Sequence, residues 1–548
     1  MSAHPIEGPA SALEDVLDAA EPRHPRPLGE LVERLSAEGR LRAVLRDDAP
    51  VDASAVAGLE IGGITDDTRL LRPGQVFAAI PGARTDGHDL VAAALAGGAV
   101  AAIVEQPVAG AGGVQLVVER SATALGSAAG WWYGDPSREL AVAGVTGTDG
   151  KTTTTFLVAA ALEAAGLSTG LVGTVETRIG PLRVRTPGHI TTPGALQLQC
   201  LLRAMASGGD RAAVIETTSH GLAAERVSGV AYDAAIFTNL THEHLEFHGT
   251  FEAYRAAKLS LFERLSQPAK PNVPRRPRLG VVNADDPAAA RFADATRTAG
   301  ARLLTYGLAP GADVRAGSIE ERSGGLTIGV VGPGWTGDLA LRLAGRFNVH
   351  NALAAVALGI GWELDPEAVR AGLEGLDRVP GRMERIERGQ PFTVIVDFAH
   401  SPAALESVLD ELGPLAAAAG GELIAVFGSA GERDTAKRPM MGRIAGERCR
   451  LVVVTDEDPR GEDRLAILDE IAAGAEAAGR KRGMDLLVIA DRGAAVAEAL
   501  GRARPGDVVV LAGKGHEPTI EGPVGALPWD ERAAAEQALA ALGFGDGA

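Results

Sequence analysis

The sequence is poor in cysteine, with only Cys200 and Cys449 in 548 residues. Because two distant cysteines cannot form a disulfide framework or a four-cysteine zinc site, we expect two buried thiols in a reducing compartment. The basic start and apolar core of a secretory signal are also missing. No apolar run reaches the ~20 residues that a membrane span needs. We therefore expect a cytoplasmic protein.

Basic residues are outnumbered as well. The chain has 53 Lys and Arg against 71 Asp and Glu, which gives a formal net charge of −18. Such a charge argues against nucleic acid or an anionic membrane as the main partner. It does not exclude small anionic ligands, since backbone N–H groups and local cations can hold them. We expect small-molecule partners and a monomer.

The pattern of apolar and polar segments indicates a leader followed by three α/β units. A chain of this length is expected to hold about three or four domains. Residues 1–27, rich in Pro, Ala and acids, are predicted to be a mobile leader. In residues 28–138, 139–379 and 380–548, apolar strands alternate with helical segments. That alternation is typical of parallel sheets covered by helices. The predicted fold class is α/β, with a central parallel-sheet unit and a Rossmann-like third unit.

A glycine-rich turn, GVTGTDGKTTTTF, opens the second unit directly after a predicted strand. Gly147 and Gly150 allow a turn whose N–H groups face a phosphate, and Lys151 can reach the outer phosphates. The strict phosphate-loop motif would have glycine at Val145, and an ordinary glycine turn is the alternative. The predicted nucleotide contacts are Gly147, Thr148, Asp149, Gly150, Lys151, Thr152 and Thr153.

Two later strand ends carry clustered polar residues, IETTSHGLAAERV and FTNLTHEHLEFHGTFEAYRAAK. The histidines of the second cluster suggest zinc, but Glu246 stands where the HExxH motif needs its second histidine. With no cysteine nearby and phosphates expected, an oxygen-rich Mg²⁺ site fits better. For each histidine alone, a structural hydrogen-bonding role is the alternative.

The segments TGTDGKTT, ETTSHGL, TNLTHEHLEFHG and YRAAK resemble, in order and spacing, the central ATPase domain of the Mur ligases, which build the peptide stem of bacterial peptidoglycan. The resemblance implies Mg²⁺ ligands at Thr152, Glu216, His244 and Lys258, and catalytic roles for Lys151, His244 and Lys258. Lys258 would be a carbamate, formed when a neutral amine captures CO₂; an unmodified surface lysine is the alternative. The segments GRFNVHNALAA, VPGRME and DFAHSP imply further ATP contacts at Asn351, Arg382, Asp397 and His400.

The first unit, with ITDDTRLLRPGQVFAAIPGARTDGHDL, resembles the uridine-diphosphate-binding domain of the tripeptide synthetases of this family. The resemblance implies contacts to the nucleotide-sugar peptide from Thr68, Ala83, Arg84, Thr85, Thr191, Thr192, Thr218 and Arg226. The chain departs from the family pattern at several positions, and Thr68 itself stands where the family usually has Ser. Ile190 and Asp149 stand where Asn is common, and Ala224 stands where a Gln can contact the substrate.

In the third unit, GERDTAKRPMMG, TDEDPRGED and AGKGHE resemble the family's amino-acid site. The implied contacts are Arg433, Glu457, Asp458, Pro459, Arg460, Gly513 and Glu517. Arg460 can form a two-pronged ion pair with the distal carboxylate of meso-diaminopimelate. Asp458 is negative where the family usually has neutral Asn, which favours a plain amine, as on lysine or ornithine. We take the retained arginine to decide for meso-diaminopimelate and keep lysine and ornithine as alternatives.

The resemblance thus implies an ATP- and Mg²⁺-dependent amide ligase of peptidoglycan precursor synthesis, and so a part in cell-wall biogenesis, cell shape and division. It would add the diamino acid to the D-Glu of UDP-N-acetylmuramoyl-L-Ala-D-Glu through an acyl phosphate. One alternative is a folylpolyglutamate-type ligase, which the DDTR and TDGH segments of the first unit argue against. A P-loop ATPase that drives motion or transport is another, but it would leave the motifs of the third unit unexplained.

Overall fold

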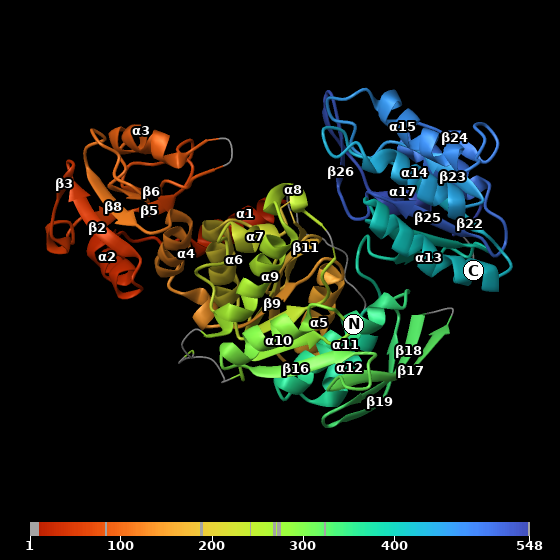
Figure 1. Ribbon diagram of the computed structural model, residues 1–548, viewed down its shortest axis with the longest axis horizontal. Coiled ribbons are helices and arrows are strands. Elements are labelled where there is room, and N and C mark those ends of the chain that lie inside the picture. The colour runs from red at the N-terminus through yellow and green to blue at the C-terminus, as the bar shows by residue number, and fades with distance from the viewer. Residues whose placement is uncertain are drawn as a thin grey trace.

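The computed structural model describes residues 10–82, 85–186, 190–241, 243–266, 270, 276–322 and 325–545. Three sheets covered by helices follow one another along the chain (Figure 1), which is the predicted α/β class. Ala83, Arg84 and His242 lie outside the described residues. Within the described ranges, no helix has the length and apolar character needed to cross a bilayer.

The first sheet has six strands in the order β3-β2-β8-β7-β6-β5. Neighbours from β5 to β8 are parallel, and β7 and β8 are buried throughout, which explains their continuous apolar sequences. Helices α2 and α4 pack on one face and α3 on the other. The elements of this unit are β1 (Arg26–Pro27), α2 (Leu28–Ala37), β2 (Leu41–Arg46), β3 (Ala49–Pro50), β4 (Glu60–Ile61), β5 (Gly63–Thr65), β6 (Gln75–Ala78), α3 (Val91–Ala96), β7 (Ala101–Val104), β8 (Val114–Val118) and α4 (Ser121–Trp132).

Part of the expected leader is a helix, α1 (Ala10–Ala20). Leu13 is buried in the core beneath α6 (Ala195–Ser207), and Leu17 and Ala20 pack against the same core. These positions recur at helical spacing, a signal that the composition of the segment conceals. The expectation of a mobile leader is therefore wrong for this helix.

The central sheet has eleven strands in the order β12-β11-β10-β13-β9-β14-β15-β16-β17-β18-β19. The run from β10 to β17 is parallel, as predicted, whereas antiparallel strands extend the sheet beyond β10 and beyond β17. Its strands are β9 (Ala141–Thr146), β10 (Thr169–Val172), β11 (Glu176–Ile179), β12 (Leu182–Arg185), β13 (Ala212–Glu216), β14 (Ala234–Phe237), β15 (Leu279–Asn283), β16 (Arg302–Gly307), β17 (Val314–Arg322), β18 (Gly325–Gly332) and β19 (Trp335–Leu341). Its helices besides α6 are α5 (Lys151–Ala164), α7 (Ser219–Ala223), α8 (Leu245–His248), α9 (Phe251–Glu263), α10 (Ala289–Thr298), α11 (Phe347–Gly361) and α12 (Pro366–Glu374).

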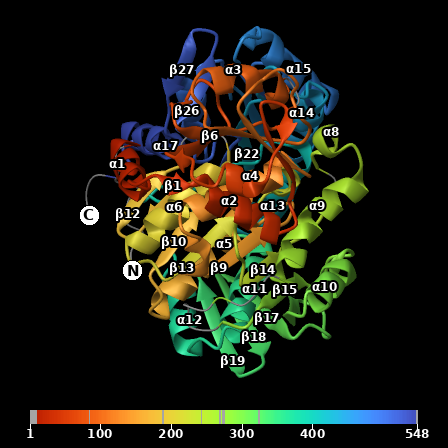
Figure 2. The same cartoon turned by 90° about the vertical axis from the view of Figure 1, so that its left-hand side faces the viewer.

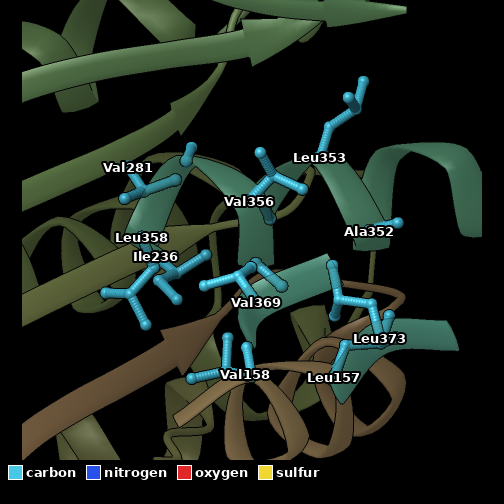
Figure 3. Packing of buried hydrophobic residues seen from close by; sticks show 14 of the residues in the cluster. Leu157, Val158, Ile236, Val281, Ala352, Leu353, Val356, Leu358, Val369 and Leu373 are labelled. Carbon is cyan, nitrogen blue, oxygen red and sulfur yellow. The ribbon is translucent and has the colours of Figure 1, made fainter. Parts of the chain in front are cut away.

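Helices α5, α11 and α12 share one core over the central sheet. Figure 3 shows Val158 of α5, Val356 of α11 and Val369 of α12 close to Ile236 of β14, and all four side chains are fully buried. Each buried aliphatic side chain stabilises the fold by roughly 1.5–3 kcal/mol. This packing holds α5, and with it the glycine turn at its N-terminus, in place.

The third sheet has six strands in the order β20-β21-β25-β22-β23-β24, parallel except for the edge strand β20. The four polar segments singled out in the sequence follow β21, β22, β23 and β25, at the sheet edge where α/β folds bind ligands. A separate hairpin, β26–β27, lies at the opposite end of the molecule from the β17–β19 meander (Figure 2). The elements are β20 (Glu384–Ile386), β21 (Thr393–Asp397), α13 (Pro402–Ala418), β22 (Leu423–Phe427), α14 (Lys437–Arg448), β23 (Leu451–Val454), α15 (Arg464–Ala477), β24 (Leu486–Val488), α16 (Arg492–Gly501), β25 (Val508–Ala512), β26 (Thr519–Gly522), β27 (Gly525–Pro528) and α17 (Glu531–Ala541).

Candidate functional site

The glycine turn between β9 and α5 requires both of its inner glycines. Gly147 has φ 153°, and a Cβ there would lie 1.8 Å from Thr238 Oγ1. Gly150 has φ 78°, and a Cβ there would lie 2.4 Å from Asn351 Oδ1. Any larger residue at either position would therefore push the turn away from its neighbours.

The end of β14 holds the turn from the other side. Thr238 Oγ1 donates to the carbonyl of Asp149 at 2.6 Å, and the backbone N–H of Asp149 donates to Asn239 Oδ1 at 2.8 Å. The Thr148 hydroxyl lies 2.9 Å from the hydroxyl of Tyr254. The Asp149 side chain itself is exposed. Asn239 was missed as a site residue, although it belongs to the TNLTHEHLEFHG segment.

Lys151 contacts the phosphate turn, and Asn351 of α11 contacts the first turn of α5. Lys151 Nζ donates to the carbonyls of Gly147 at 3.1 Å and Thr148 at 2.6 Å. Asn351 Oδ1 accepts from Thr154 Oγ1 at 3.1 Å, and so ties α11 to α5. An ammonium group beside the N-terminus of α5 makes this end of the helix a suitable place for phosphate.

Thr152 and Glu216 form the hard-oxygen centre of the site. Thr152 Oγ1 donates to Glu216 Oε1 at 2.9 Å, and Glu216 Oε2 accepts from the backbone N–H of Thr174 at 3.0 Å. From the third unit, Arg382 Nη2 donates to Thr152 Oγ1 at 3.4 Å. A hydroxyl beside a carboxylate is a donor set that suits Mg²⁺. The sequence did not predict Thr174 as a site residue, because its position after a strand was the only feature that pointed to it.

His244 lies in an aromatic cluster. Its ring centroid is 4.5 Å from that of His220 and 6.3 Å from that of Tyr254. Burial, with help from His244, lowers the pKa of His220 to about 4, so that His220 is neutral at pH 7. Across the described ranges, no three His, Cys, Asp or Glu side chains are grouped as a metal site. The structure thus joins Thr152 to Glu216 and does not complete the predicted metal-ligand set.

Lys258 is buried, with 1% of its surface exposed. Its Nζ donates to the carbonyl of Gly147 at 2.6 Å and lies 4.5 Å from the centroid of the Tyr254 ring. Burial, reinforced by Lys151, holds the pKa of Lys258 well below its ordinary value. The alternative of a surface lysine is therefore wrong, and the surroundings of Lys258 favour its uncharged amine form.

The residues expected to contact the acceptor peptide come together beside Glu216. Thr192 Oγ1 donates to the carbonyl of Glu216 at 2.9 Å and lies 3.0 Å from Thr218 Oγ1. Arg226 Nη1 donates to the carbonyl of Thr192 at 2.9 Å. The Thr191 hydroxyl is 2.8 Å from the Thr174 hydroxyl. This cluster places hydroxyl groups and a cation next to the Thr152–Glu216 pair.

The family departures at Ile190 and Ala224 both lie on the surface. Thr68 is half-buried and Thr85 exposed; they lie in loops that follow β5 and β6 of the first unit. That unit reaches the central one through Arg120, whose Nη1 is 3.5 Å from Glu225 Oε1.

In the third unit, the segments after β23 and β25 are joined by a fully buried lysine that sequence reasoning missed. Lys514 Nζ donates to Asp458 Oδ1 at 2.8 Å and to Glu517 Oε2 at 2.6 Å. Gly513 has φ 100°, and a Cβ there would lie 3.0 Å from Glu457 Oε2. That oxygen is buried and lacks a hydrogen-bond partner among the described residues. It is a ready acceptor for an ammonium group.

Other predicted residues of this unit lie at its borders. Arg433 is exposed in the loop after β22, and Pro459 is buried. Asp397 accepts from the backbone N–H groups of two residues at 2.8 Å each, and burial raises its pKa. His400 Nδ1 is 2.9 Å from the carbonyl of Phe398. Asp397 therefore supports the junction between the second and third units.

A cavity of about 540 Å³ lies between α5 and α12 of the central unit and α17 of the third unit. Its lining includes Arg178, Arg185 and Glu517 but not the phosphate turn. At its border, Arg185 Nη2 is 2.5 Å from Asp530 Oδ2.

Comparison with known proteins gives three family matches along the chain. The model of the Mur ligase middle domain matches residues 145–359, and that of the Mur ligase glutamate ligase domain matches residues 381–515. The model described as the Mur ligase family catalytic domain matches residues 60–132. Each match falls on a different one of the three sheets.

The chain is 50% identical over 492 residues to the UDP-N-acetylmuramyl-tripeptide synthetase of Roseiflexus sp. (strain RS-1), covering 89% of this chain and 96% of that protein. It is 42% identical to the UDP-N-acetylmuramoyl-L-alanyl-D-glutamate–2,6-diaminopimelate ligase of Geobacter metallireducens, covering 80% and 84%. A solved structure of a ligase of the latter name aligns with a TM-score of 0.63 and 29% identity, covering 89% and 96%. From these matches, the chain belongs to the Mur ligase family of ATP-dependent ligases.

Proposed function

We propose that this ligase joins a diamino acid to the D-Glu side-chain carboxylate of UDP-N-acetylmuramoyl-L-Ala-D-Glu, and that the diamino acid is meso-diaminopimelate. The observation that carries the proposal is the meeting of three parts at Thr152. The phosphate turn supplies Thr152, Glu216 and the acceptor cluster approach it from the strand ends, and Arg382 reaches it from the third unit. The activities for which the relatives are named support the same reaction.

The chemistry has two steps. The D-Glu carboxylate oxygen attacks the γ-phosphorus of ATP, the bond to the bridging oxygen breaks, and ADP leaves. The amine of the diamino acid then attacks the acyl carbon of the acyl phosphate, inorganic phosphate leaves, and the nitrogen loses a proton to give the amide. Phosphorylation is needed because a free carboxylate is a poor electrophile at neutral pH.

The chain's own groups position and screen the reactants. Lys151 and the N–H groups of the turn hold the phosphates, and Arg382 brings the third unit to the nucleotide. Thr191, Thr192 and Thr218 orient the acceptor peptide. Asn351 and His400 contribute to the nucleotide site, and Thr68, Arg84 and Thr85 to the sugar nucleotide.

Thr152 and Glu216, with His244 and the carbamate of Lys258, would hold Mg²⁺. When bound, Mg²⁺ neutralises the phosphate and carboxylate charges that have to approach each other. Two observations fit this group: Thr152 and Glu216 offer oxygens 2.9 Å apart, and the buried Lys258 is held toward the neutral form that reacts with CO₂. His244 would have to leave its aromatic cluster to join them.

For the amino acid, Arg460 would bind the distal carboxylate of meso-diaminopimelate, and Glu457 and Glu517 would accept from its ammonium groups. Arg433 and the backbone at Gly513 complete the subsite. The negative charge of Asp458 is offset by Lys514, which supports the diaminopimelate assignment over lysine or ornithine. We further propose a monomer that works in the cytoplasm, in peptidoglycan precursor synthesis for the cell wall.

Release of ADP tests the proposal. We expect release to require the UDP-linked dipeptide and a diamino acid together, because neither alone can complete the reaction. Release that is independent of both would instead indicate a P-loop ATPase. Release stimulated by a folate and glutamate would indicate the folylpolyglutamate-type alternative.

A further inference from the structure

We infer that Glu521 lowers the selectivity of the amino-acid subsite for meso-diaminopimelate by competing with the distal carboxylate of the substrate for Arg460. The inference rests on the proposed function, since it takes Arg460 to face the diamino acid. Glu521 lies in β26, four residues after Glu517, and its sequence context predicts no role.

Arg460 and Glu521 are joined through both side chain and backbone. Arg460 Nε donates to Glu521 Oε2 at 2.9 Å, and the backbone N–H of Arg460 donates to the carbonyl of Glu521 at 2.8 Å. Arg460 has φ 53°, an uncommon conformation for a residue with a side chain, and the backbone bond helps to hold it. The two side chains are 20% and 33% exposed, so that a small molecule can still reach them.

The surroundings of the pair fix the position of Glu521. Its backbone N–H donates to Asp458 Oδ1 at 2.8 Å, and Lys514 Nζ donates to the same oxygen at 2.8 Å. The charge of Asp458 is therefore compensated within the fold by a buried ammonium group. The carboxylate that pairs with Arg460 is that of Glu521, not that of Asp458.

This arrangement affects substrates with a distal carboxylate differently from those with a plain amine. The carboxylate of meso-diaminopimelate has to displace Glu521 from Arg460 or bind beside it against like charge. The side-chain ammonium of lysine meets no such competition. Glu521 therefore weakens the preference for meso-diaminopimelate that Arg460 alone would create.

Glu521→Gln tests the inference, because it removes the charge and keeps the shape. We expect the KM for meso-diaminopimelate to fall about tenfold, because one part-buried charged competitor for Arg460 is removed. The kcat should not change. The KM for lysine should not fall. Glu498→Gln is the matched control, since Glu498 pairs with Arg502 at 2.7 Å on the exposed face of α16 and should leave both KM values unchanged.

A double variant separates competition from a structural effect. In an Arg460→Ala background, Glu521→Gln should no longer lower the KM for meso-diaminopimelate, because the group competed for is gone. An unchanged KM in the single variant, an equal fall in the control, or a fall that persists without Arg460 would overturn the inference. If the unaltered protein turned over none of the diamino acids, the proposed function would fall as well.

Discussion

The amine nitrogen of Lys258 donates a hydrogen bond of 2.6 Å to the carbonyl of Gly147, 111 residues earlier in the chain. This contact joins the middle of α9 to the phosphate turn. Because burial holds the pKa of Lys258 well below its usual range, the amine is inclined to be neutral and able to take up CO₂. The resulting carbamate would lie beside the phosphates.

Lys258→Ala should abolish turnover, with a loss of at least about 100-fold, because the charge-positioning group beside the turn disappears. Added bicarbonate should not restore activity, since no amine remains to be modified. Product formation at saturating substrates measures the effect. Lys481→Ala, at an exposed lysine of the third unit, is the control and should be fully active. Near-normal turnover in Lys258→Ala would remove the metal-bridging role.

Gly147→Ala should raise the Kd for ATP at least about tenfold, since a Cβ at φ 153° and 1.8 Å from Thr238 Oγ1 forces the turn out of shape. Gly501→Ala is a control for the loss of a glycine, because a Cβ at Gly501 meets open space. Nucleotide binding by titration calorimetry distinguishes the two variants. Equal ATP affinity in both would show that the turn does not hold the phosphates.

Two Glu–Arg pairs with the same separation should differ greatly in their effect on stability. Glu531 pairs with Arg492 at 2.7 Å with both side chains fully buried, whereas Glu498 pairs with Arg502 at 2.7 Å on the surface. Glu531→Ala leaves a buried guanidinium uncompensated and should cost about 3 to 5 kcal/mol in the free energy of unfolding.

Glu498→Ala should cost less than about 1 kcal/mol. Denaturant unfolding, followed by far-UV circular dichroism, measures both losses. Similar losses in the two variants would contradict the argument from burial.

His516 should make stability depend on pH in the acid range. Burial, followed by the positive charges of Arg382, Arg185 and Lys514, lowers the pKa of His516 to about 3. The unfolded chain takes up this proton near pH 6.5, so the folded state loses stability as the pH falls from there toward 3, and keeps it in full above 6.5.

His516→Gln should therefore flatten the dependence of the free energy of unfolding on pH in this window, by up to about 1.4 kcal/mol per pH unit. Denaturant titrations of both proteins at several pH values provide the measurement. Parallel curves for the two proteins would mean that His516 is protonated in the folded state.

The parts of the site that the sequence predicted are those encoded locally. Gly147, Gly150, Lys151 and Thr152 follow one another on a strand–turn–helix segment, so their chemistry and geometry are readable together. The buried parallel strands were also readable, because burial on both faces makes their sequences continuously apolar. The acceptor cluster of Thr192 with its neighbours depended on the family resemblance.

What the sequence could not supply depends on segments that meet only in the fold. Lys514 pairs with Asp458, and Glu521 pairs with Arg460. In both pairs the partners are distant in sequence and meet only in the folded chain. Helix α1 was mistaken for a leader because its composition outweighed its spacing. The β17–β19 strands escaped notice because they alternate between exposed and buried positions instead of forming apolar runs.

The most direct test of the account is the mass of the product. The full chain would be incubated with UDP-N-acetylmuramoyl-L-Ala-D-Glu, ATP and Mg²⁺, and with meso-diaminopimelate, lysine or ornithine in separate reactions. The account predicts a UDP-linked tripeptide that contains meso-diaminopimelate, together with ADP and phosphate. A product with lysine or ornithine alone would contradict the assigned amino acid, and no product with any of the three would contradict the ligase reaction itself.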